Sequence, residues 1–140
     1  MNNFVWREFS SDDRAMAIAW LTCAARKKSG VGGSFPADFY PATGIAVYSK
    51  SKLVCVLPIY LELTSNTAVL GFCTPDPELD GKNKHQAVTF ALQSALEYSQ
   101  KLGKKYILGL FGNRAVNRIA DRMGFITGDR NVEEKFLILK

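Results

Sequence analysis

The stretch of residues 53–63 constrains the fold more than any other part of the sequence. It reads LVCVLPIYLEL and is apolar at nearly every position. An extended strand here would therefore present apolar side chains on both of its faces. Such a strand belongs in the middle of a sheet that is covered on both sides. Pro58 has no N–H to donate, so it marks a bulge or an edge stretch within this strand.

Further elements follow from local patterns. Short runs of β-branched and aromatic residues predict strands over 4–9, 44–48, 68–73, 105–111 and 134–139. Residues 49–52 form a short polar turn between two of these strands. Apolar residues at helical spacing predict helices over 13–27, 83–102 and 113–123. Two prolines in 74–81 are expected to prevent a continuing strand ladder.

The segment 29–42 is rich in glycine and proline and is predicted to be a loop with one helical turn at 36–39. It also carries Phe35, Phe39 and Tyr40. These aromatic residues either pin the loop to the core or line a pocket, and the sequence leaves both interpretations open.

The order of elements is strand, helix, loop, three-strand meander, helix, strand, helix and strand. A run of antiparallel strands followed by β-α-β-α-β predicts one α/β (α+β) domain over residues 1–140. Its central sheet should be mixed and mostly antiparallel, with six to seven strands and helices on both faces.

Composition excludes several classes of protein. With 140 residues, of which 47% are hydrophobic, the chain fits one folded domain. Cys23, Cys55 and Cys73 form no C-x-x-C pair, and His85 is the only histidine. Neither a disulfide framework nor a metal site is therefore expected. The sequence begins without a signal pattern and has no apolar run near the ~18 residues of a membrane span, so we expect a cytoplasmic protein without a membrane partner.

The net charge of +5 has two interpretations. It can serve solubility, or it can attract an anionic partner such as a nucleotide cofactor. The basic residues are scattered and no basic stripe with interleaved aromatic residues is present, so nucleic acid is not the expected partner.

Three segments carry a resemblance to a known family. WREFSSDD at 6–13 is similar to an opening strand and helix cap, and the strand at 68–73 is followed by TPDPE and a long helix. GNRAV at 112–116 and RMGF at 122–125 look like an Asn-x-x-Ala…Gly-Phe segment at matching spacing. Together they resemble the GNAT superfamily of acyl-CoA-dependent N-acyltransferases, over nearly the whole chain. The chain also looks somewhat like the GNAT-like proteins of phages.

The resemblance implies a place for acyl-CoA. In the family, the cofactor lies where two central parallel strands separate, and its pyrophosphate sits on the N-terminus of the long helix, where free amides and the helix dipole attract anions. The family pattern at that helix is Arg/Gln-x-x-Gly-x-Gly/Ala, and the matching stretch here has Gln86 and Val88 at the glycine positions. The implied acetyl-CoA-binding residues are Thr74, Lys82, Lys84, His85, Gln86 and Asn113.

The resemblance also bears on catalysis. Many members carry a tyrosine as general acid at a position occupied here by Ala120. Glu62 is the implied general base, with Tyr60 two residues away, although an exposed glutamate at a strand end is the alternative. Cys73, at the end of a strand, could be a nucleophile or a small buried apolar residue.

Two functions remain open on the sequence alone. The first is acetyl transfer from acetyl-CoA to a primary amine, with the sheet polarising the thioester carbonyl through a backbone N–H near Thr74. The acceptor would be an amine-bearing small molecule or protein. The second is a GNAT-like structural or interaction protein without catalysis, of a phage virion or host-interaction type, in a homo-oligomer or larger assembly.

Overall fold

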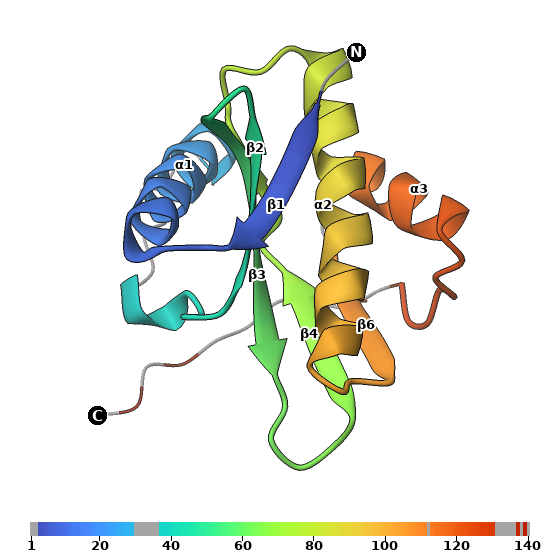
Figure 1. The fold of residues 1–140 in the computed structure, drawn as a ribbon. Coiled ribbons are helices and arrows are strands. Elements are labelled where there is room, and N and C mark those ends of the chain that lie inside the picture. The colour runs from blue at the N-terminus through green and yellow to red at the C-terminus, as the bar shows by residue number, and fades with distance from the viewer. Residues whose placement is uncertain (1–2, 30–36, 112, 131–136, 138, 140) are drawn as a thin grey trace.

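The computed structural model describes residues 3–29, 37–111, 113–130, 137 and 139, with side chains left aside at 24–29 (Figure 1). Among them, six strands form one sheet. They are β1 (Phe4–Glu8), β2 (Gly44–Ser49), β3 (Lys52–Leu61), β4 (Thr67–Gly71), β5 (Thr74–Pro75) and β6 (Tyr106–Leu110).

The strand order is β1-β2-β3-β4-β6, and the short β5 pairs with β3 beyond the end of β4. All pairs are antiparallel except β4 and β6, which run parallel. The mixed, mostly antiparallel sheet predicted from the sequence is therefore confirmed. The predicted strand over 134–139 falls largely outside the described residues.

Three helices cover the two faces of this sheet. Helix α1 (Ser11–Ser29) lies on one face, and α2 (Gly81–Lys101) and α3 (Arg114–Arg122) lie on the other (Figure 1). The interior is divided accordingly. Ala17 of α1 packs with Tyr40 and Val56 on one side, and the apolar residues of α2 pack with Cys55 and Leu57 of β3 on the other. Strand β3 is thus buried on both faces, as its sequence predicts.

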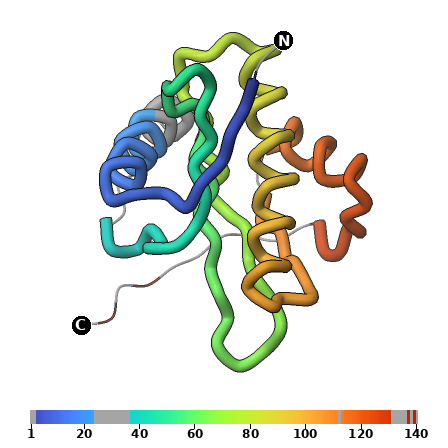
Figure 2. Tube along the Cα trace, in the orientation of Figure 1, coloured from blue at the N-terminus to red at the C-terminus, as the bar shows by residue number. Residues whose placement is uncertain are grey.

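A tight turn joins β2 to β3. Lys50 and Ser51 both adopt left-handed backbone conformations, with φ of 51° and 66°. Two such residues make a type I′ turn, whose twist matches that of the flanking strands. The tube in Figure 2 shows this turn and the chain leading into α2 at the same end of the molecule, and the β3–β4 and α2–β6 connections at the other end.

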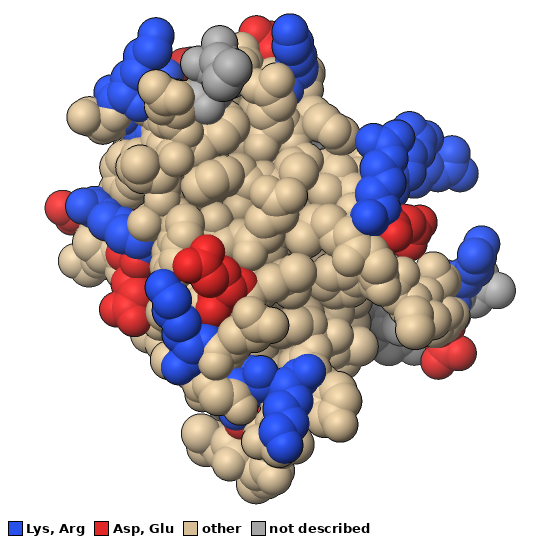
Figure 3. Space-filling view, turned by 45° about the vertical axis from the view of Figure 1, so that its right-hand side comes forward, with Lys and Arg blue, Asp and Glu red and all other residues tan. Residues whose placement is uncertain are grey.

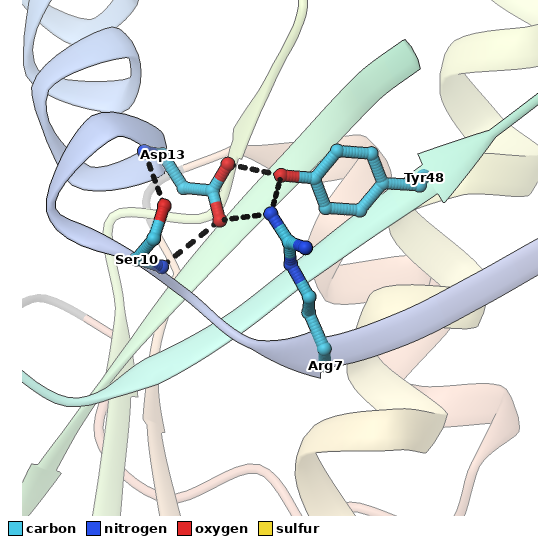
Figure 4. A network of polar contacts seen from close by, with 4 residues as sticks. All are labelled: Arg7, Ser10, Asp13 and Tyr48. Atoms are coloured by element: carbon cyan, nitrogen blue, oxygen red, sulfur yellow. Dashed lines mark hydrogen bonds and ion pairs between the residues drawn. The ribbon is translucent and has the colours of Figure 1, made fainter. Parts of the chain in front are cut away.

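The start of α1 is fixed to the sheet by four side chains (Figure 4). The Asp13 carboxylate accepts hydrogen bonds from the Ser10 amide at 2.9 Å and from the Tyr48 hydroxyl. The Asp13 amide in turn donates to Ser10 Oγ at 3.2 Å, a reciprocal cap. The Arg7 guanidinium lies 3.4 Å from the same carboxylate and 4.5 Å above the Tyr48 ring. This network joins α1 to β1 and β2.

Charged residues lie mostly around the edge of the face drawn in Figure 3. Basic side chains adjoin one another on the right, an acidic group lies left of the centre, and the upper centre is uncharged. In the part of the chain that the structure describes, no helix has the length and apolarity to cross a membrane.

Candidate functional site

The central feature of the candidate site is a bulge where β4 gives way to β5. Ile59 of β3 opposes Leu70, whereas Val56 opposes Thr74. Two residues of β3 therefore face three residues of the other strand, which is the one-residue excess of a β-bulge. Phe72 within it has a φ of 52°, a left-handed conformation that is uncommon for a residue with a side chain.

The parallel strand pair ends beside the same bulge. Strands β4 and β6 stay in register up to Gly71 and Leu110. Beyond that point Thr74 and Pro75 pair with β3. The absence of an N–H on Pro58 is tolerated here because that residue lies opposite the bulge. The sequence-based expectation of no strand after Cys73 was wrong in one respect, since Pro75 enters the ladder at a position where no amide is required.

A backbone donor lies at the end of this strand pair. The Asp76 amide donates to the Val54 carbonyl of β3 at 2.9 Å. Strand alternation then directs the Thr74 amide to β3 and the Cys73 amide to the opposite side. Within the described residues the Cys73 amide makes no backbone hydrogen bond. A donor of this kind, on a rigid strand, is suited to hold a carbonyl oxygen.

Aromatic side chains cover the bulge from the α1 face. The centroid of the Phe72 ring lies 5.8 Å from that of Phe39, 6.4 Å from that of Tyr40 and 6.5 Å from that of Tyr60. The Tyr40 side chain is buried, whereas the Phe39 side chain is exposed at the surface. Of the two sequence interpretations for this loop, pinning to the core therefore holds for Tyr40. Phe35 lies outside the described residues.

The Tyr40 hydroxyl is buried and has no hydrogen-bond partner among the described residues. The neighbouring Thr74 hydroxyl donates to the Phe72 carbonyl. Burial raises the pKa of Tyr40 above its ordinary value, although the Thr74 hydroxyl opposes the shift. The phenol therefore stays protonated at neutral pH and retains a proton to donate.

Arg14 of α1 holds the loop that carries Tyr40. Its Nε donates to the Pro41 carbonyl at 3.1 Å, and its Nη2 donates to the Ala37 carbonyl at 2.7 Å and to the Tyr40 carbonyl. Its guanidinium carbon also lies 5.8 Å from the Tyr40 ring centroid. One side chain therefore satisfies three carbonyls and fixes the ring beside the bulge.

The start of the long helix differs from expectation. Helix α2 begins at Gly81, two residues before the predicted start, and Asp80 is its N-cap. The Asp80 carboxylate accepts from the Asn83 amide and from Asn83 Nδ2, both at 2.8 Å. These bonds lower the pKa of Asp80. A carboxylate therefore already lies against the amides of the first turn, which does not fit a pyrophosphate there.

The predicted cofactor residues divide into two groups. Lys82, Lys84, His85 and Gln86 all lie in the first two turns of α2, and Lys82 and His85 are exposed. Thr74 is buried in β5 at the bulge. The structure thus places one group on the helix and Thr74 next to the Cys73 amide.

Glu62 lies away from the bulge. It follows the end of β3, three residues beyond Ile59 and six beyond Val56, the two residues that border the bulge; an extended strand spans roughly 10 Å and 20 Å over those intervals. Its carboxylate accepts from the Thr64 hydroxyl at 2.7 Å and the Thr64 amide at 2.9 Å. These bonds lower the pKa of Glu62 to about 2.

Asn113 and Ala120 have structural positions in α3. The Asn113 side chain accepts from the Ala115 amide at 2.8 Å and caps the helix. Ala120 is buried. In the described part of the chain, no cluster of three or more histidine, cysteine or acidic side chains could hold a metal ion.

Sequence reasoning missed two features of this site, the Tyr40 hydroxyl and the Asp80 cap. The Tyr40 hydroxyl depends on how distant segments meet, and no local pattern marks it. The Cys73 amide lies next to Thr74, near which a backbone donor was expected. Asp80 did leave a signal, since an aspartate three residues before Asn83 is typical of a helix N-cap.

The architecture matches those of solved structures. It matches yncA from Salmonella typhimurium, solved with its cofactor acetyl-CoA, with a TM-score of 0.70 and 13% identity over 90% of this chain and 81% of that one. A predicted acetyltransferase from Clostridium acetobutylicum, solved with acetyl-CoA, gives 0.65 and 8% over 95% and 96%. Glucosamine-6-phosphate N-acetyltransferase from Arabidopsis thaliana gives 0.63 and 12% over 96% and 99%.

No protein-family model and no curated protein matches the sequence. The similarity is therefore one of fold and not of sequence, and it spans nearly the whole chain. The mixed six-stranded sheet and the three helices of the described residues are consistent with it. The chain has the fold of the GNAT acetyltransferases.

Proposed function

We propose that this protein transfers an acyl group from an acyl-CoA thioester to a primary amine. The observation that carries the proposal is the Cys73 amide, which has no backbone acceptor among the described residues and lies two residues beyond Gly71, the last residue of β4 that pairs with β6. The fold supports it, because similar chains are acetyltransferases or were solved with acetyl-CoA. Amino sugars are the first acceptors to test, since one of these enzymes acts on glucosamine-6-phosphate.

The reaction needs little covalent participation by the protein. The amine nitrogen attacks the thioester carbon and forms a C–N bond, the C–S bond breaks, and the thiolate leaves. The amine loses one proton and the thiolate gains one. The Cys73 amide would donate to the carbonyl oxygen as it becomes negative, the kind of donor that often contributes most to acyl transfer.

The buried Tyr40 hydroxyl is the proton donor that we assign to the leaving thiolate. It comes from a loop, whereas the general acid implied by family resemblance would come from the position of Ala120. Its side chain is held beside the bulge by Arg14. Burial raises the pKa of Tyr40 and makes it a weaker acid than a free phenol, so the assignment depends on its position beside the bulge. Glu62 remains the proposed base by resemblance alone, and its low pKa weakens it for that role.

A second candidate function is a structural or interaction module without catalysis. It is favoured by the carboxylate at the start of α2 and by the buried Ala120 at the family's acid position. Under this alternative the GNAT fold persists while the cofactor and acid positions serve packing.

Binding of acetyl-CoA distinguishes the two candidate functions. Calorimetric titration of the purified chain up to millimolar acetyl-CoA should give saturable heat, and amine-dependent release of free thiol should follow with a panel of amino sugars and small amines. Saturable binding with thiol release supports the enzyme. No heat at millimolar acetyl-CoA excludes it and leaves the structural module.

A further inference from the structure

Two of the amides at the start of α2, those of Asn83 and Lys84, are already engaged within the chain. The Asn83 amide donates to Asp80 Oδ1 at 2.8 Å and the Lys84 amide donates to the Asp80 carbonyl at 2.8 Å. The Asn83 side-chain amide holds the second carboxylate oxygen, Oδ2, at 2.8 Å. A bound phosphate would have to displace this carboxylate to reach the same donors.

The charges around this helix start do not favour a diphosphate, because the nearby carboxylates and lysines are equal in number. Asp76, Glu78 and Asp80 precede the helix within five residues. Lys52 lies 3.5 Å from the buried Asp76 carboxylate and is thereby engaged. The remaining nearby cations are Lys82 and Lys84, which follow Asp80 in the first turn.

Resting on the proposed function, we infer that the acyl donor is recognised by its acyl-pantetheine arm and not by its nucleotide diphosphate. The substrate class is then acyl thioesters of pantetheine in general, of which acyl-CoA is one member. The thioester end meets the bulge with its available Cys73 amide, and the carboxylate cap of α2 repels the diphosphate end.

The wild-type test compares two donors. Dissociation constants and kcat/KM for acetyl-CoA and for S-acetyl-pantetheine should agree within about threefold, less than the tenfold that corresponds to 1.4 kcal/mol. The nucleotide half of CoA, 3′-phospho-ADP, should not compete with acetyl-CoA. A tenfold preference for acetyl-CoA, or competition by 3′-phospho-ADP, would overturn the inference. If neither donor binds, the proposed function itself fails, which is a distinguishable result.

The variant test removes the charge and keeps the cap. Asparagine caps helices as well as aspartate does, so Asp80→Asn should fold normally. It should bind acetyl-CoA roughly two- to threefold more tightly, the scale of one screened charge–charge repulsion near a surface, and S-acetyl-pantetheine unchanged. Glu78→Gln, which removes an exposed carboxylate outside the cap, is the matched control and should give a smaller change. Unchanged or weaker acetyl-CoA binding by Asp80→Asn contradicts the inference.

A direct readout comes from backbone amide NMR of the wild-type chain. Addition of acetyl-CoA should shift the Cys73 amide resonance and leave those of Lys82, Asn83 and Lys84 in place. Large shifts at the helix start together with binding would show that the diphosphate does displace the Asp80 carboxylate.

Discussion

The sulfur atoms of Cys55 and Cys73 lie 3.9 Å apart, between β3 and the bulge. The contact places the Cys73 side chain with the apolar residues under α2. Strand alternation directs its amide away from β3, to the side of the strand on which β4 pairs with β6. The side chain and the amide of this residue can therefore be tested separately.

Cys73→Ala keeps the amide and should retain acyl transfer within about threefold. Cys73→Pro removes the amide, which makes no backbone hydrogen bond, and should lower kcat/KM by about a hundredfold or more, as the loss of one oxyanion donor does. Thermal melting checks that both variants fold. A folded and fully active proline variant would rule out the amide; if that variant does not fold, the NMR shift of the wild-type Cys73 amide with acetyl-CoA decides instead.

Asp13 is predicted to make the stability of the chain depend on acid. Burial would raise the pKa of its carboxylate, but the hydrogen bonds from Ser10 and Tyr48 and the charge of Arg7 outweigh burial and lower it. The folded state therefore gains stability above the unfolded pKa of about 4. That gain is lost as the pH falls through the lower, folded pKa.

Asp13→Ala should lower the free energy of unfolding at pH 7 by about 1–3 kcal/mol, because it leaves the Ser10 amide and the Tyr48 hydroxyl without their acceptor. The loss should shrink as the pH is lowered below 4, which urea unfolding at several pH values would measure. Asp12→Ala, an exposed neighbour in the same turn, is the control. Equal effects of the two substitutions would contradict the role given to this network.

Glu62 can be tested as a base through its pH profile. Because its carboxylate has a pKa of about 2 and accepts hydrogen bonds from Thr64, Glu62→Gln should reduce kcat/KM by less than about threefold and leave the pH–rate profile between pH 5 and 9 unchanged. A positioned general base typically contributes 10²–10⁴-fold. A loss of that size would establish Glu62 as the base despite its distance.

The fold was predictable where one segment carries its own pattern. Residues 53–63 show by composition that they form a central strand, and Gly103 marks the end of α2 through its left-handed φ of 80°. The start of α2 was placed two residues late. Two prolines and Gly81 argue for a loop, and the cap formed by Asp80 outweighs them.

The site was less predictable because it depends on register between strands. A bulge exists only where β3 and β4–β5 fall one residue out of step, which neither strand shows alone. Tyr40 is placed by Arg14, 26 residues earlier in the chain. Family resemblance supplied Glu62 and the residues of α2, and the ends of these elements could be located from the sequence. Resemblance could not show that Thr64 donates to the Glu62 carboxylate or that the Asp80 carboxylate accepts from the first turn of α2.

Tyr40 and Tyr48 offer a paired test of the proposed proton donor. The Tyr48 hydroxyl donates to Asp13 and serves the fold, whereas the Tyr40 hydroxyl is buried with no hydrogen-bond partner in the described chain. The Thr74 hydroxyl lies close enough to affect the pKa of Tyr40 but makes no well-formed hydrogen bond with it, and a hydroxyl without a well-formed bond adds little to stability. Tyr40→Phe should therefore leave the free energy of unfolding unchanged or raise it, and should lower kcat by about tenfold or more through loss of the proton to the thiolate.

Tyr48→Phe should do the reverse, lowering stability by about 1 kcal/mol through the lost hydrogen bond and leaving kcat intact. Urea unfolding and thiol release on the same preparations measure both quantities. A donor with a better leaving group, such as a thioester of an aromatic thiol, needs less protonation, so it should restore most of the rate to Tyr40→Phe. Full activity of Tyr40→Phe with acetyl-CoA, or a loss that the better leaving group does not reduce, would show that the hydroxyl does not supply this proton.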